Sequence, residues 1–174
     1  MKILIVYSSR NGVAKKCAEL LANELADKHM STLVDCRKED IPAPAGFDAV
    51  VIGSSVRMEN IDRRVRKYVR ENLEALNSMP CAIYICCGFT RLFSEYAEAL
   101  FPKRFQPSLG AHLFGGELKP ERVRGFDKLV VASMRNSIQT QDFEEDDRDH
   151  HDLPEIIPEN ISLLATEINA LDKR

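Results

Sequence analysis

The chain has 174 residues, of which 44% are hydrophobic and 29% are charged, a balance typical of one ordinary globular domain. Its 24 Lys and Arg and 27 Asp and Glu give a net charge of -3, which argues against a nucleic-acid-binding protein. No apolar run approaches the ~18 residues that span a bilayer, and the first apolar run is too short for a signal peptide. We therefore expect residues 1–174 to form a single cytoplasmic domain without a membrane span.

The sequence contains five cysteines, an odd number whose positions match neither a CxxC motif nor the spacing of a metal site. Free thiols of this kind are usually buried and behave as small apolar side chains. We therefore expect reduced cysteines in the core and no bound metal. These residues are Cys17, Cys36, Cys81, Cys86 and Cys87.

Short apolar runs alternate along the chain with segments of helical period. The runs predict five strands, at residues 2–7, 33–36, 49–52, 81–87 and 111–118. The first, third and fourth runs are almost continuously apolar, which is typical of central strands buried on both faces. The second run is shorter and more polar, as an edge strand would be.

Apolar residues at helical spacing predict helices at residues 13–25, 61–76, 93–100 and 157–171, the last with a proline in its first turn. Residues 126–138 could form a strand or a helix, and a spacing of four between their apolar residues favours a helix. The alternation predicts an α/β doubly wound fold, a five-stranded parallel sheet in the order 2-1-3-4-5 with helices on both faces. Ligands of such sheets bind outside the carboxyl ends of the strands.

Residues 142–152 contain seven acidic residues and one arginine, together with His150 and His151. Like charges at this density favour a solvated, mobile loop, and metal capture or docking of a partner are the alternatives.

Small polar residues connect the first predicted strand directly to the first predicted helix. A turn of this kind presents backbone N–H groups and the positive end of the helix dipole to an anion. The turn matches neither GxGxxG nor GxxxxGK[ST], so a phosphomonoester fits better than a dinucleotide or a nucleoside triphosphate. The alternative is that Ser9 or Asn11 only caps the helix. The turn consists of Ser8, Ser9, Arg10, Asn11, Gly12, Val13 and Ala14.

This strand, turn and helix resemble the FMN-phosphate loop of the flavodoxin family, most closely the branch that includes the menaquinone-dependent protoporphyrinogen oxidases of bacteria. Residues 51–57 (VIGSSVR), 76–80 (LNSMP) and 114–118 (FGGEL) are also similar to segments of that branch. The resemblance extends from residue 1 to about residue 140. It implies a flavodoxin-like fold with FMN as the cofactor.

The resemblance also implies which residues bind FMN. The turn of residues 8–14 would hold the phosphate, one loop would run along the isoalloxazine ring, and another would lie on its other side. Two departures stand out: Ala14 replaces a Thr or Ser common in the family, and no ring-stacking Trp or Tyr is evident, although Phe89 could cover one face. The two ring loops would consist of Ser54, Ser55, Val56 and Arg57, and of Cys87, Gly88, Phe89 and Thr90.

The function implied by the resemblance is that of an FMN-dependent oxidoreductase enzyme whose catalytic residues the sequence does not identify. Its redox partner would be a protein or a small molecule such as a quinone or a porphyrinogen. The alternatives are a single-electron carrier flavodoxin and an interaction module that has lost FMN. A response-regulator receiver is disfavoured, because serine and glycine occupy the places of its acidic residues.

Residues 57–70 contain six basic residues and two acidic ones, a local charge of +4. Beside a flavin ring this charge would favour the anionic reduced form, and with it a two-electron partner such as a quinone. The alternative is a basic but solvated helix face.

Overall fold

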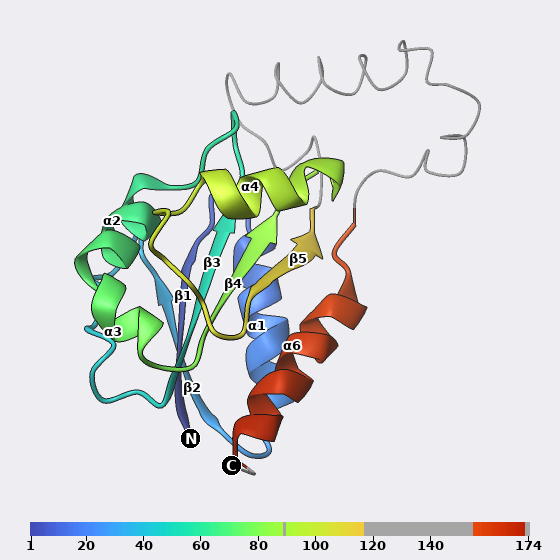
Figure 1. Ribbon diagram of the computed structural model, residues 1–174. Coiled ribbons are helices and arrows are strands. Elements are labelled where there is room, and N and C mark those ends of the chain that lie inside the picture. The colour runs from blue at the N-terminus through green and yellow to red at the C-terminus, as the bar shows by residue number, and fades with distance from the viewer. Residues whose placement is uncertain (89, 117–154, 173–174) are drawn as a thin grey trace.

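The computed structural model describes residues 1–88, 90–116 and 155–172 (Figure 1). Five parallel strands form one sheet in the order β2-β1-β3-β4-β5, which confirms the predicted fold class and strand order. The strands are β1 (Lys2–Ser8), β2 (Met30–Asp35), β3 (Ala49–Ser55), β4 (Cys81–Cys86) and β5 (Ala111–Gly115).

Helices cover both faces of this sheet (Figure 1). Helices α1 and α6 pack against each other and on one face, while α2, α3 and α4 cover the other. Their bounds are α1 (Val13–Leu25), α2 (Arg63–Glu71), α3 (Leu73–Asn77), α4 (Phe93–Ala99) and α6 (Pro158–Leu171), and a short 3-10 helix, η1 (Thr90–Leu92), precedes α4.

Successive side chains of β1 point to opposite faces of the sheet and enter two different cores. Ile3 and Ile5 belong to the core under α1 and α6, whereas Leu4 and Val6 belong to the core under α2, α3 and α4. All four side chains are fully buried. Continuous apolar runs are therefore needed in the central strands, because the side chains on both faces of the sheet pack against helices.

The boundaries of several elements differ from those predicted. Strand β2 begins at Met30, and β3 continues to Ser55 instead of ending at residue 52. The predicted helix at 61–76 is divided at Asn72, whose backbone and side-chain N–H groups both donate to the Tyr68 carbonyl. Gly115 ends β5 with a φ of +76°. Residues 117–118, 126–138 and 142–152, for which we predicted structure or mobility, lie outside the described residues.

Tyr84 of β4 joins the sheet to the first turn of α1. Its hydroxyl donates to the Ala14 carbonyl at 2.8 Å, and its ring stacks on Phe114 with 4.6 Å between centroids. The ring lies over Gly53 of β3 so closely that a Cβ atom there would be 1.9 Å from the Tyr84 Cζ atom. Only glycine at residue 53 leaves room for this buried phenol.

Residues 114–116 pair with residues 155–157. Gly116 N–H donates to the Glu155 carbonyl at 3.1 Å, and Ile157 N–H donates to the Phe114 carbonyl at 3.1 Å. Gly115 and Ile156 form an antiparallel bridge. The chain therefore returns to the end of β5 before it enters α6.

All five cysteines are buried and free, which confirms the prediction of reduced thiols in the core. Two of them touch, with 3.7 Å between the Sγ atoms of Cys17 in α1 and Cys86 in β4. Among the helices of the described residues, none has the length and apolar composition needed to cross a bilayer.

Candidate functional site

Three strands bring the predicted loops together at the carboxyl edge of the sheet. The register pairs Ser8 of β1 with Ser54 of β3, and pairs Ser55 with Cys86 of β4. Parallel neighbouring strands end at the same edge, so the turn after β1 and the loops after β3 and β4 are adjacent.

Gly12 is the N-cap residue of α1, with a φ of +88°. The first helical hydrogen bond runs from Lys16 N–H to the Gly12 carbonyl at 2.9 Å. The alternative that Ser9 or Asn11 caps the helix is therefore wrong. With neither a capping side chain nor an acidic residue in its first turn, α1 leaves its first N–H groups and the positive end of its dipole available to an anion.

The two serines of this turn differ in their partners. The Ser8 hydroxyl donates to Asp62 Oδ2 at 3.0 Å, and Ser8 is buried. Ser9 Oγ is also buried but has no hydrogen-bond partner among the described residues. A buried hydroxyl without a partner costs free energy unless a ligand satisfies it. Ser9 is thus the side-chain donor that the turn can offer to an anion.

Other residues of the turn offer their backbone. Arg10 and Asn11 are exposed, while Val13 and Ala14 are buried in the core under α1. Ala14 is fully buried, so a Thr or Ser at this position would have to find room in the core.

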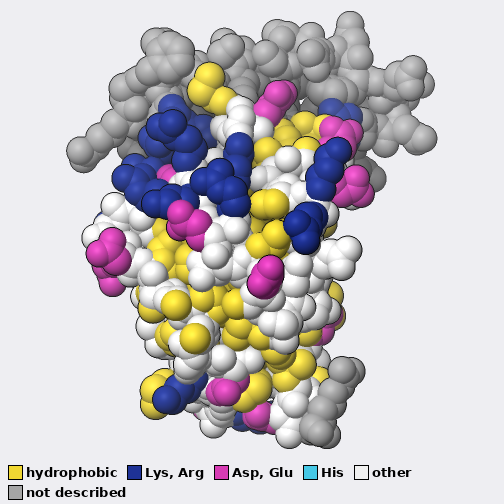
Figure 2. Space-filling model, turned by 60° about the vertical axis from the view of Figure 1, so that its left-hand side comes forward, with side chains coloured by type: hydrophobic (Ala, Val, Ile, Leu, Met, Phe, Trp, Pro, Cys, Tyr) yellow, Lys and Arg dark blue, Asp and Glu magenta, His cyan; other side chains and the backbone are white. Residues whose placement is uncertain are grey.

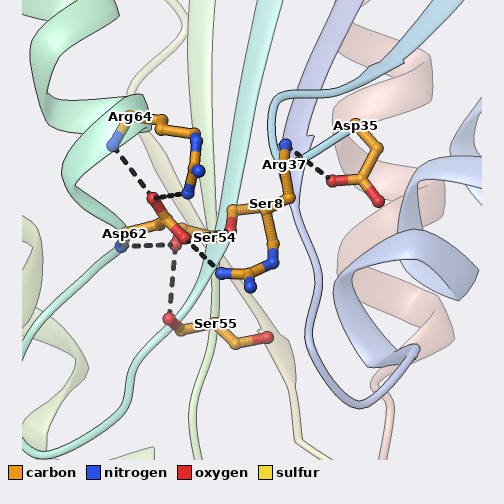
Figure 3. A network of polar contacts seen from close by, with 7 residues as sticks. All are labelled: Ser8, Asp35, Arg37, Ser54, Ser55, Asp62 and Arg64. Atoms are coloured by element: carbon orange, nitrogen blue, oxygen red, sulfur yellow. Dashed lines mark hydrogen bonds and ion pairs between the residues drawn. The ribbon is translucent and has the colours of Figure 1, made fainter. Parts of the chain in front are cut away.

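Asp62 lies at the centre of a polar network that joins three strand ends to α2 (Figure 3). It caps α2, where Oδ1 accepts the Arg64 N–H at 2.9 Å. Oδ2 accepts both the Ser8 hydroxyl and Arg37 Nη1, the latter at 2.8 Å. The Asp62 N–H points toward Ser54 Oγ at 3.5 Å. This network connects the ends of β1, β2 and β3 to the start of α2.

The pKa of Asp62 lies below its usual 3.8. Burial is the largest single influence and favours the neutral acid, but hydrogen bonds from Arg64 N–H, the Ser8 hydroxyl and Arg37 together outweigh it. A lowered pKa in the folded state contributes stability that is fully present above the pKa of the unfolded chain. This stability is lost as the pH falls through the folded-state value.

Replacing Asp62 with Asn is therefore expected to lower the free energy of unfolding at pH 7, because Arg37 loses its anionic partner. The deficit should shrink as the pH falls from about 5 to below the usual carboxyl pKa. Asn remains a good N-cap, so the pH-dependent part reports the charge. Urea denaturation at a series of pH values measures the difference, and a deficit that is constant over this range would contradict the prediction.

Ser54 and Ser55 are the last residues of β3, so they are not in the loop where they were predicted. The loop starts at Val56, whose N–H donates to the Cys86 carbonyl at 2.9 Å. Arg57 and Asn60 then exchange backbone hydrogen bonds of 2.8 and 3.0 Å.

The two residues inside this turn are strained. Met58 has a φ of 47° and Glu59 a φ of 56°, so both occupy the left-handed region that glycine normally takes in such turns. Met58 is 66% exposed. The turn holds an apolar side chain in solvent at the carboxyl edge of the sheet.

The loop after β4 begins with buried Cys87 and with Gly88. Gly116 lies against this peptide, since a Cβ atom there would be 2.8 Å from the Cys87 carbonyl group. Thr90 opens η1, and Phe89 lies outside the described residues. The start of this loop is therefore packed against the end of β5.

Basic side chains gather over α2 on the face shown in Figure 2. Arg63, Arg64, Lys67 and Arg70 are exposed there. Lys67 pairs with Glu71 at 3.8 Å within the helix. The basic stretch predicted from the sequence thus forms an exposed helix face that begins next to the loop after β3.

Three residues of the site were not predicted from the sequence: Asp62, Arg37 and Tyr84. Asp62 precedes a helical period and could have been recognised as an N-cap. Arg37 and Tyr84 carry no local signal, because their partners, Asp62 and Ala14, are distant in the chain.

A family model described as a flavodoxin domain matches residues 4–146. The protoporphyrinogen IX dehydrogenase (quinone) of Escherichia coli strain K12 is 33% identical over 140 residues, which cover 75% of this chain and 77% of that protein. The protein of the same name from Leishmania major is 28% identical over 139 residues, covering 75% of this chain and 60% of that protein. A flavodoxin structure from Streptococcus pneumoniae TIGR4 matches with a TM-score of 0.56 at 13% identity, covering 98% of this chain and 99% of that one.

Proposed function

Because the chain belongs to the flavodoxin family, we propose that it binds FMN and passes electrons from a porphyrinogen-type reductant to a quinone. Family membership, which the sequence motifs predicted, makes a flavin the expected cofactor. The reductant and the acceptor are those named for the relatives that are similar over three quarters of this chain.

The observation that carries this proposal is the buried Ser9 hydroxyl in the turn that leads into α1, which has no partner in the described part of the chain. A buried donor beside uncapped N–H groups suits the phosphate of FMN, which offers several acceptor oxygens and negative charge. Gly12 contributes because open space surrounds the position of a Cβ atom there, so a ligand can approach the backbone. We assign the phosphate to the turn of residues 8–14, with Ser9 as its side-chain donor.

The loops after β3 and β4 would hold the isoalloxazine ring. Val56 and Arg57 would lie along one side, with Ser54 and Ser55 supporting them from the end of β3. Cys87 and its neighbours Gly88, Phe89 and Thr90 would form the other side. The Val56 N–H bond to the Cys86 carbonyl joins the two loops where the strands end, so the spacing between them is fixed by the sheet.

Bound FMN would supply the redox chemistry, since flavins transfer both hydride and single electrons. The chain binds and orients the cofactor, and its basic residues set the local charge. Arg57 follows β3, and the exposed arginines of α2 begin shortly after it. Positive charge on this side favours an anionic reduced ring, which suits an enzyme better than a low-potential single-electron carrier.

A titration of the protein with FMN tests this proposal. Replacing Ser9 with Ala should weaken FMN binding by roughly ten- to a hundredfold, the loss expected for a hydrogen bond to a charged group. The matched control is Ser31→Ala. Ser31 Oγ is also buried without a partner among the described residues, but it lies at the opposite end of the sheet, paired with Ile3.

Calorimetry or quenching of flavin fluorescence measures the affinities. The Ser31 variant should bind FMN as the unmodified protein does. If the Ser9 variant also does so, the phosphate is not held by this turn. If the unmodified protein binds no FMN, the chain is instead an interaction module on a flavodoxin-like scaffold.

A further inference from the structure

A carboxylate is hydrogen-bonded to the first residue of the turn assigned to the phosphate. Asp62 accepts the hydroxyl of Ser8, the first residue of that turn, and its side chain is only 9% exposed. Hydrogen bonds hold this group in its charged form. Neither Asp62 nor its partner Arg37 belongs to the predicted FMN-binding residues.

An ionised carboxylate in this position opposes the binding of a phosphomonoester. A phosphate monoester carries between one and two negative charges at neutral pH, as phosphorylated side chains do. Like charges near the same turn repel, and partial burial reduces the screening by salt. Local neutralisation of the charge of Asp62 therefore strengthens the preference of the turn for a phosphorylated ligand.

Arg37 provides this neutralisation. Its Nη1 atom is 2.8 Å from Asp62 Oδ2, the same oxygen that accepts the Ser8 hydroxyl. Arg64 also faces the carboxylate, but at 3.9 Å and with its side chain 58% exposed, compared with 27% for Arg37. The closer and more buried guanidinium makes the stronger interaction.

The position of Arg37 depends on the end of β2. Its N–H donates to Asp35 Oδ1 at 3.1 Å, and the N–H groups of Lys38 and Glu39 both donate to the Asp35 carbonyl. This turn directs the Arg37 side chain across the end of β1, the strand between β2 and β3 (Figure 3). Arg37 therefore reaches Asp62 at the place where the phosphate turn begins.

Given the proposed binding of FMN, on which this inference depends, we infer that Arg37 is a specificity-determining residue. Its guanidinium neutralises Asp62 and thereby lets the turn prefer a phosphorylated flavin to an unphosphorylated one. Arg37 acts through Asp62 and Ser8, so it is a positioning residue. The expected effect of its loss is confined to the phosphate part of the binding energy.

Comparing FMN with riboflavin separates this role from a general structural one. Arg37→Gln should weaken FMN binding about tenfold while changing riboflavin binding less than about twofold, because only FMN carries the charge that Asp62 repels. The matched control is Arg104→Gln, the loss of one exposed arginine whose carbonyl accepts the Asn77 side-chain N–H, at the other end of the sheet from the turn. That variant should bind both flavins with unchanged affinity.

The double variant Arg37→Gln, Asp62→Asn provides the second test. Removing both charges should bring FMN affinity back to within about threefold of the unmodified protein, since the two residues are directly coupled. Equal losses for FMN and riboflavin in Arg37→Gln, or no recovery in the double variant, would overturn the inference and indicate a structural role.

Inorganic phosphate distinguishes this inference from the proposed function. At constant ionic strength, phosphate should raise the melting temperature of the unmodified protein and of the double variant, but not that of Arg37→Gln. If this pattern is found and FMN does not bind, the inference about the turn holds and the proposed cofactor is wrong. If phosphate affects all three proteins equally, Arg37 does not govern the turn.

Discussion

Replacing Gly53 with Ala should lower the free energy of unfolding by about 3 kcal/mol or more, the upper range for overpacking a core. The added methyl group would overlap the ring of Tyr84, which is fully buried. A displaced ring would lose its hydrogen bond to the Ala14 carbonyl and its stacking on Phe114. Urea denaturation of the cofactor-free protein measures the change.

The control places the same substitution in a Tyr84→Leu background. Without the phenol ring, Gly53→Ala should lower the free energy of unfolding by less than about 1 kcal/mol, because the two positions are coupled only through their contact. An equal cost in both backgrounds would show that Tyr84 is not the obstacle and that the backbone at residue 53 is the sensitive feature.

Replacing Gly12 with Val should weaken FMN binding by more than about a hundredfold, since it both strains the turn and blocks access to the backbone. A β-branched residue strongly disfavours the φ of +88° found here. Relief of this strain would rotate the N–H groups at the start of α1 away from the phosphate. Calorimetric titration with FMN provides the measurement.

Gly46→Val is the matched control for strain. Gly46 has a φ of +98° and open space around it, but it precedes β3 at the other end of the sheet. Both variants should lose stability by a similar amount, and only the Gly12 variant should lose FMN affinity. Comparable affinities for FMN in the two variants would mean that the turn after β1 does not hold the cofactor.

The strand order was predictable from the sequence because the central strands must be apolar on both faces. The continuous runs of β1, β3 and β4 and the more polar run of β2 fix which strands are central and which lies at an edge. Boundaries were less predictable. Ser54 and Ser55 were predicted as loop residues because they are polar, yet both pair with β4 and belong to the sheet.

The turn after β1 was predicted correctly as the junction of a strand and a helix, but the roles of its two serines could not be read from the sequence. Ser8 and Ser9 are chemically identical, and only the position of Asp62 decides which hydroxyl is already bonded. The partnership of Asp62 and Arg37 is equally hidden, because it joins the turn after β2 to the residue that caps α2, 25 positions further along the chain. Local sequence patterns carry no information about such contacts.

The pairing of Gly116 with Glu155 has a consequence for the connectivity of the chain. Because these residues are hydrogen-bonded, the two ends that the connection between residues 116 and 155 must join lie side by side. The entropy of closing a loop grows only with the logarithm of its length, about 0.6 kcal/mol for each doubling. A change in the number of residues between these two positions would therefore alter the entropy of closure only slightly and would leave the distance to be bridged unchanged, because the sheet and α6 hold the two ends together.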